Sequence, residues 1–166
     1  MPALDPGLRK DLERTTVAAR LASEEGARAA LDVLAVRLGD APASMQPDGR
    51  ALRTALRARA KVLGEGDRER GCGLLAEEIA YETWHRLYFS RTLAENELLR
   101  HPEYGVPVTL EECAQLARDE GATDAWDLAA RYAAQMLPRL FREDDPSARV
   151  PLAREHRARL EPWSLG

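Results

Sequence analysis

The segment from Ala80 to Gly105 constrains the fold of this 166-residue chain more than any other. It reads AYETWHRLYFSRTLAENELLRHPEYG, in which the pair His101-Pro102 is a strong helix stop. Large apolar and aromatic side chains cluster in its first half: Trp84, Leu87, Tyr88 and Phe89. We therefore expect a long, packed helix in the middle of the chain that continues to about Arg100.

The rest of the chain shows helical patterning and no sustained alternation of β-branched residues, so strands are not expected. We expect helices over residues 6–38, 48–63, 110–120, 124–137 and 151–161, in addition to the long helix. The long helix could begin as early as Asp67. The predicted fold class is all-α, a helical domain of five to seven helices around one long central helix.

Several residues indicate where these helices bend and end. Gly26 could bend the first helix, and Gly39 is placed to cap its end. Gly64 is expected to terminate the second helix. Thr109 and Glu112 form the T-x-x-E pattern of a capping box, which predicts the start of the short helix that follows.

Composition and length indicate one folded domain over residues 1–166. Hydrophobic residues make up 45% of the chain and charged residues 31%, and the net charge is −4, which is ordinary for a folded protein. No apolar run approaches the ~18–20 residues that cross a bilayer, and Cys72 and Cys113 are too few and too far apart for a disulfide framework. We expect a cytoplasmic protein with reduced thiols and no membrane partner.

The net charge conceals an asymmetry. Residues 1–70 carry a net charge of +2 and residues 71–166 a net charge of −6. The basic excess is concentrated on one face of the second predicted helix, in Arg50, Arg53, Arg57 and Lys61. Such a row could follow the phosphates of duplex DNA, and these four residues are the candidate nucleic-acid-binding site. The same pattern also fits a solvated face or one paired with acidic side chains, because no aromatic is interleaved for base stacking.

Other polar residues of the long helix carry alternative interpretations. Glu82 and His85 have the E-x-x-H spacing of di-iron bundles, with Glu78 one turn earlier, but such a site needs a second pair that this chain lacks. A partly buried histidine bonded to a carboxylate is the alternative. Glu95 and Asn96 are expected in the interior of the helix, where Asn is a poor helix former, so they are candidates for a specific hydrogen bond.

Motifs of catalysis are missing from this sequence. Cys113 lies in the first turn of a predicted helix, where a lowered thiol pKa is conceivable, but the neighbouring Glu111 and Glu112 oppose it. Neither a glycine-rich phosphate loop nor a G-x-S-x-G motif is present. We assign no catalytic, cofactor-binding or metal-binding residue.

A dense set of framework residues between Tyr81 and Gly105 carries a family resemblance: Tyr81, Trp84, His85, Arg86, Phe89, Arg91, Leu93, Ala94, Glu95, Asn96 and the HPEYG stop at 101–105. The pattern continues through Pro107, Val108, Thr109, Leu110, Trp126, Ala129, Ala130, Arg131, Leu137, Pro138, Phe141, Arg142, Asp144, Asp145 and Pro146 to about Leu160. In these positions the chain resembles the helical region that precedes the catalytic domain of large bacterial DNA adenine methyltransferases of restriction-modification and phage-exclusion (BREX, PglX-like) systems.

The resemblance implies a module that works beside a catalytic part, which binds S-adenosylmethionine and methylates adenine N6. That chemistry needs a glycine-rich cofactor loop and an N-P-P-Y-type loop for the flipped base, and neither is present in this sequence. The resemblance ends near Leu160, so the chain is expected to be a detached N-terminal region, a split subunit or the product of a truncated gene.

Two hypotheses about function follow. In the first, the chain is a non-catalytic helical module of a DNA adenine methyltransferase, whose partners are the catalytic domain or subunit and duplex DNA. The second is a stand-alone helical protein–protein interaction module that binds through its acidic C-terminal half.

Overall fold

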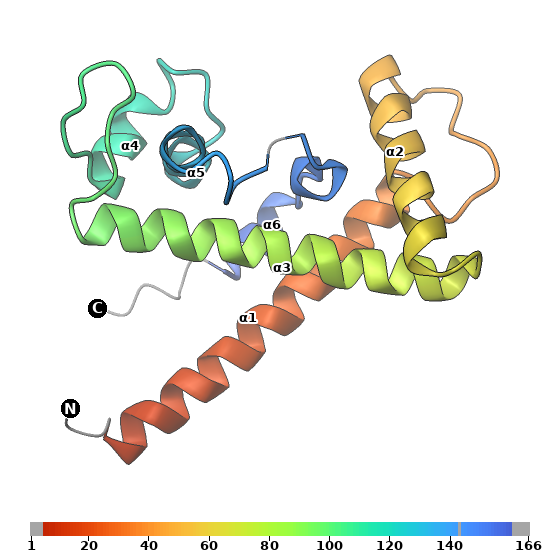
Figure 1. Cartoon of the computed structure of the whole chain (residues 1–166), viewed down its shortest axis with the longest axis horizontal. Coiled ribbons are helices and arrows are strands. Elements are labelled where there is room, and N and C mark those ends of the chain that lie inside the picture. The colour runs from red at the N-terminus through yellow and green to blue at the C-terminus, as the bar shows by residue number, and fades with distance from the viewer. Residues whose placement is uncertain (1–4, 143, 161–166) are drawn as a thin grey trace. The chain divides into compact units, whose positions relative to one another are not determined.

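The computed structural model describes residues 5–142 and 144–160 and is all-α (Figure 1). Its elements are α1 (Pro6–Val33), α2 (Pro47–Leu63), α3 (Arg68–Glu95), α4 (Leu110–Leu116), α5 (Ala125–Met136), the 3₁₀ helix η1 (Pro146–Arg149) and α6 (Arg154–Ala158). Extended pairing within the described ranges is limited to an isolated antiparallel bridge between Arg100 and Pro107. The predicted fold class is therefore confirmed, including the long α3.

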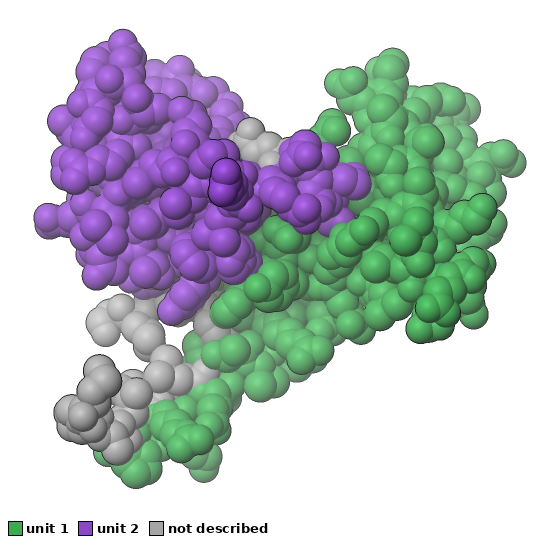
Figure 2. All heavy atoms as spheres, viewed as in Figure 1, with its two compact units in different colours: residues 1–84, 149–166 green, residues 85–148 purple. Residues whose placement is uncertain are grey.

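The chain divides into two compact units, coloured separately in Figure 2. Unit 1 comprises residues 1–84 and 149–166, and unit 2 comprises residues 85–148. Helix α3 contributes its first part to unit 1 and its last part to unit 2. The expectation of a single domain over residues 1–166 stays a prediction.

Unit 1 has a core in which small and aliphatic side chains meet. Fully buried positions include Ala27 and Leu31 of α1, Leu56 of α2, and Leu75 and Ile79 of α3. All five are completely excluded from solvent, so the apolar faces of these three helices account for the core of this unit.

Gly26 lies within α1, which continues without interruption to Val33. A Cβ at position 26 would come within 2.8 Å of Leu152 Cδ2 and 2.9 Å of His156 Cβ. The residue is therefore explained by the close approach of the 152–156 segment, a packing role that sequence reasoning did not assign to it.

Helices α1 and α3 both end earlier than their sequence patterns indicate, and each is followed by a non-glycine residue with positive φ. Helix α1 ends at Val33 and not at 38, because Ala35 takes a left-handed conformation (φ 51°) and Val36 N–H donates to the Leu31 carbonyl at 3.0 Å. This is the Schellman arrangement. Glu97 (φ 56°) ends α3 in the same way, at Glu95 and not near residue 100. The predicted cap at Gly39 was therefore wrong.

Gly64 and Gly71 pack against each other where α2 passes into α3. A Cβ on Gly64 would lie 2.6 Å from Gly71 N, and a Cβ on Gly71 would lie 2.1 Å from the Ala60 carbonyl oxygen. Gly64 caps α2 as predicted, but with φ −86°. These glycines therefore serve close backbone contact and not a left-handed turn.

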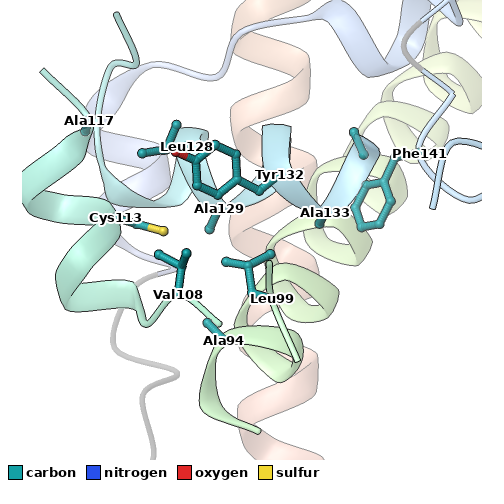
Figure 3. Packing of buried hydrophobic residues seen from close by; sticks show 11 residues of the cluster. Ala94, Leu99, Val108, Cys113, Ala117, Leu128, Ala129, Tyr132, Ala133 and Phe141 are labelled. Carbon is teal, nitrogen blue, oxygen red and sulfur yellow. The ribbon is translucent and has the colours of Figure 1, made fainter. Parts of the chain in front are cut away.

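Unit 2 has a second core built from α4, α5 and the end of α3 (Figure 3). Leu99, Cys113, Leu128, Tyr132 and Phe141 are each at most 1% exposed. Phe141 packs edge-to-face on Phe89 of α3, with ring centroids 6.4 Å apart. The side chains of this cluster come from both sides of the loop at 96–109, so the loop is held to the unit at its two ends.

The starts of α4 and α5 match the sequence. Thr109 and Glu112 form the predicted capping box, in which each side chain pairs with the backbone N–H of the other residue. Asp124 caps α5 by accepting from Asp127 N–H at 2.9 Å. Helix α4 ends at Leu116, four residues before the predicted end. In the part of the chain that the structure describes, no helix is long and apolar enough to cross a membrane.

Candidate functional site

The arginines of the predicted basic row lie against the loop between α1 and α2. Arg50 is exposed and donates to the Met45 carbonyl through Nε at 2.9 Å and to the Ala43 carbonyl at 3.1 Å. Arg57 donates to the Val36 carbonyl at 3.0 Å and also to the Leu38 carbonyl. The structure therefore brings these guanidinium groups together on main-chain oxygens of unit 1.

Arg53 is the most enclosed member of the row, with 7% of its surface exposed. Its Nε donates to the Ala35 carbonyl at 3.1 Å, and one terminal nitrogen donates to the carbonyls of Leu38 (2.8 Å) and Gly39 (3.2 Å). The carbonyls that follow the last turn of a helix lack intrahelical donors, and the planar guanidinium fork supplies several donors at once. Arg53 thus satisfies the end of α1 and fixes the loop behind it.

Lys61 lies in the last turn of α2 and is exposed. A cation there also interacts favourably with the negative end of the helix dipole. Of the four predicted residues, Arg50 and Lys61 are the exposed ones, while Arg53 is buried and Arg57 is half-buried. The loop contacts were not foreseen because the sequence does not show which carbonyls a helix end leaves unpaired.

The E-x-x-H pattern on α3 has other contacts. Glu78 forms an ion pair with Arg59 of α2, with Nη2 and Oε2 2.7 Å apart. The His85 ring lies tilted against Phe89, with ring centroids 4.7 Å apart, and its centroid is 6.3 Å from that of Phe141. Among the described residues, no group of three His, Cys, Asp or Glu side chains is placed to hold a metal ion.

Glu95 and Asn96 lie at the end of α3 and not in its interior. Both are exposed, and Asn96 Nδ2 donates to the carbonyl of Thr92, one turn earlier, at 2.8 Å. This local contact fits the preference of Asn for helix ends. The expected interior position was wrong because the helix is shorter than its pattern indicated.

Cys113 is completely buried in the core of unit 2. Burial, followed by the nearby Glu112 carboxylate, raises the pKa of its thiol to about 11. The helix N-terminus therefore does not lower the pKa of Cys113. At neutral pH its side chain is a protonated thiol in the core and not a nucleophile.

A polar cluster in unit 2 was missed by sequence reasoning, which treated His101 only as a helix stop. The His101 ring is stacked on Tyr104 at 4.6 Å and lies edge-on to Tyr132 at 5.2 Å. Its Nε2 is 3.6 Å from a carboxylate oxygen of Glu120. No sequence motif joins these residues, because they come from three segments: the loop after α3, the segment between α4 and α5, and α5 itself.

Tyr132 contributes a buried phenol to this cluster. Burial, and then the Glu120 carboxylate, raise its pKa to about 12, so the phenol stays protonated at any physiological pH. Its hydroxyl has no described hydrogen-bond partner in good geometry although it is close to Glu120. The cluster thus combines a histidine, a carboxylate and a neutral phenol.

Comparisons with protein-family models, with curated proteins and with solved structures gave no match to this chain.

Proposed function

We propose that this chain is a non-catalytic helical module that scaffolds the catalytic part of a DNA adenine methyltransferase of a restriction-modification or phage-defence system. The proposal rests on the resemblance between Tyr81 and about Leu160. One observation carries it further: residues of that pattern supply the packed interior of unit 2, among them Ala94, His101, Ala129 and Phe141, which are each at most 7% exposed. Most of the positions of the pattern thus lie in one folded unit, which is what we expect of a module.

The interaction with the catalytic part is assigned to exposed apolar side chains of unit 2. Tyr88, Leu98, Tyr104 and Val106 are each more than half exposed. Where such side chains adjoin, they form the kind of face that a partner covers, and we assign these residues to it. The catalytic part would bind S-adenosylmethionine, and this chain would supply rigidity and position.

A contact with DNA phosphates is assigned to Arg50 and Lys61, which are exposed. Arg53 is a less suitable contact, because its departure would leave the carbonyls of Ala35, Leu38 and Gly39 without this donor. The proposed DNA contribution is therefore smaller than the four-residue row indicates.

To test the scaffold proposal, the DNA immediately downstream of the Gly166 codon is sequenced, and the protein that it encodes is coexpressed with this chain. We expect a frame with a glycine-rich cofactor loop and an N-P-P-Y-type motif, and co-purification of its product. Unrelated downstream sequence would contradict the proposal.

A stand-alone protein–protein interaction module is the second candidate function. It is favoured by the same exposed apolar residues together with the acidic character of unit 2, whose residues 85–148 carry 7 basic and 12 acidic side chains. A basic protein partner and indifference to DNA at low salt would support this candidate over the first.

A further inference from the structure

His101 holds the loop after α3 through its backbone and its side chain. Its N–H donates to the Val106 carbonyl at 2.9 Å, and its own carbonyl accepts from Gly105 N–H at 2.8 Å. The side-chain Nδ1 lies 3.2 Å from Glu103 N and 3.4 Å from Tyr104 N, both of which donate to it. One 93%-buried residue therefore organises the turn at 101–106.

The groups that face the imidazole come from each neighbouring segment. Tyr104 stacks on the ring from the loop itself, and Tyr132 of α5 meets its edge. Glu120, in the segment between α4 and α5, faces Nε2 at 3.6 Å and keeps 38% of its side chain exposed. Cys113 of α4 lies near the Tyr132 phenol, and the thiol and the phenol are both protonated at neutral pH.

This arrangement determines the state of the ring. A nitrogen that accepts from two amides must carry its lone pair, so Nδ1 is unprotonated and the single proton of the neutral ring is on Nε2. The Glu120 carboxylate lies 3.6 Å from Nε2. The loop is thus built on the neutral Nε2–H tautomer of His101.

We propose that His101 is a proton-sensitive latch for residues 101–106: the neutral ring holds the amides of Glu103 and Tyr104, and a proton on Nδ1 releases them. Protonation turns the acceptor into a donor that faces two other donors. Nε2 faces the Glu120 carboxylate, which would pair with the imidazolium.

Opening changes the surface of unit 2. Tyr104 is 68% exposed and is positioned by its stacking on His101, and Val106 beside it is 52% exposed. Release of the Tyr104 amide frees the segment that carries both side chains. In acid this segment therefore loses the two side-chain contacts to Nδ1 and keeps only its backbone bonds, which makes partner binding through this loop dependent on pH.

The experiment is NMR of the intact chain between pH 8 and pH 5, the range in which an ordinary histidine gains its proton. At pH 8 the ¹⁵N shifts of the ring should show an unprotonated Nδ1. The exchange protection of the Glu103 and Tyr104 amides should fall by about tenfold as His101 titrates, as for loss of a local hydrogen bond. Amides in the middle of α5 should keep their protection.

Two variants that exchange a carboxylate for an amide of the same size separate the latch from general charge effects. Glu120→Gln should move the opening to lower pH, because it removes the group that favours the imidazolium. Glu103→Gln, in the same loop but with an exposed side chain, should leave the midpoint within 0.2–0.3 units, a margin of roughly the size expected for screened surface charges. A proton on Nδ1 at pH 8, unchanged amide protection over the whole pH range, or equal midpoints in the two variants would overturn the proposal.

Discussion

Arg53 donates hydrogen bonds from the buried side of α2 to three carbonyls that follow α1. From the sequence, the charge of Arg53 suggests a phosphate contact. In the structure Arg53 instead binds the end of α1, because the chain folds back and places Ala35, 18 residues earlier, next to it. Positive charges at helical spacing identify a face. The backbone oxygens near that face decide how those charges are used.

We predict that Arg53→Lys lowers the free energy of unfolding by about 2–3 kcal/mol, because a single ammonium cannot replace a buried guanidinium that serves three carbonyls. Urea denaturation followed by circular dichroism measures the change. Arg70→Lys is the matched control: its pair with Glu65 is exposed, so a change of less than about 0.5 kcal/mol is expected. Equal losses in the two variants would contradict the assigned role of Arg53.

Cys113 gives a pH dependence whose sign can be worked out. Its pKa is raised from 9.0 to about 11 in the folded chain, so between these values the folded state binds the thiol proton more tightly than the unfolded state does. Stability is complete below about pH 9 and falls as the pH rises toward 11, by at most ~1.4 kcal/mol per pH unit for one proton. Burial also raises the pKa values of Cys72 and Tyr132, which adds to the slope.

Urea unfolding under reducing conditions at several values between pH 8 and pH 10.5 should show this fall. Cys113→Ala removes the thiol and should make the curve flatter, whatever its effect on stability at pH 8. We assign the pH dependence of stability that remains in this variant to Cys72 and Tyr132. A slope unchanged by Cys113→Ala would show that the thiol titrates alike in both states.

At the scale of the elements, α1, α2 and α3 are each followed by a non-glycine residue with positive φ: Ala35, Glu65 and Glu97. An L-residue in this conformation costs about 1–2 kcal/mol relative to the right-handed region. We predict that Glu97→Gly raises the free energy of unfolding by about 1 kcal/mol, because the exposed Glu97 side chain has no described contact to lose.

Chemical denaturation of Glu97→Gly beside Gly39→Ala tests this assignment. Gly39 has an ordinary φ and open space around its Cα, so the added methyl group should be neutral or stabilise by less than about 1 kcal/mol. If Gly39 were the cap of α1, Gly39→Ala would instead destabilise by about 1 kcal/mol.

The junction of α2 and α3 depends on the absence of a side chain at Gly71. We predict that Gly71→Ala destabilises the protein by about 3 kcal/mol, since its Cβ would lie 2.1 Å from the Ala60 carbonyl oxygen and backbone would have to move. Gly73→Ala, two residues later in the same helix, meets no atom within 4 Å and should stabilise by up to about 1 kcal/mol. Thermal unfolding of the pair gives the comparison, and a loss of the same size in both would contradict the contact.

The helices themselves could be predicted from the sequence, whereas several of their ends could not. The apolar spacing and the capping box at Thr109 and Glu112 are local signals, and they placed α4 and α5 correctly at their starts. The ends of α1 and α3 depend on left-handed conformations at Ala35 and Glu97, which the residue type does not signal because neither is a glycine or an asparagine. The polar cluster around His101 was not predicted because tertiary packing brings Glu120 and Tyr132 to the loop that holds His101.

At the scale of the whole molecule, the two units carry different charges. Residues 85–148 have a net charge of −5, and the rest of the chain has a net charge of +1. An acidic unit is repelled by DNA, so any DNA affinity must come from unit 1 and should be weak. The exposed cations assigned to this contact are Arg50 and Lys61.

This assignment predicts a small salt dependence. With two phosphate contacts, the logarithm of the association constant for duplex DNA should fall with the logarithm of salt concentration with a slope of about −2. Lys61→Gln should weaken binding and reduce the slope by about one. Lys10 is the other lysine of the chain and is exposed on α1, so Lys10→Gln should leave the slope unchanged.

The measurement is fluorescence anisotropy with a short DNA duplex between 30 and 200 mM salt, which is about the range in which such weak electrostatic binding can be measured. Binding that is absent at the lowest salt, or equally reduced by both lysine changes, would remove the phosphate contact from the proposed function and leave the scaffold role to the apolar residues of unit 2.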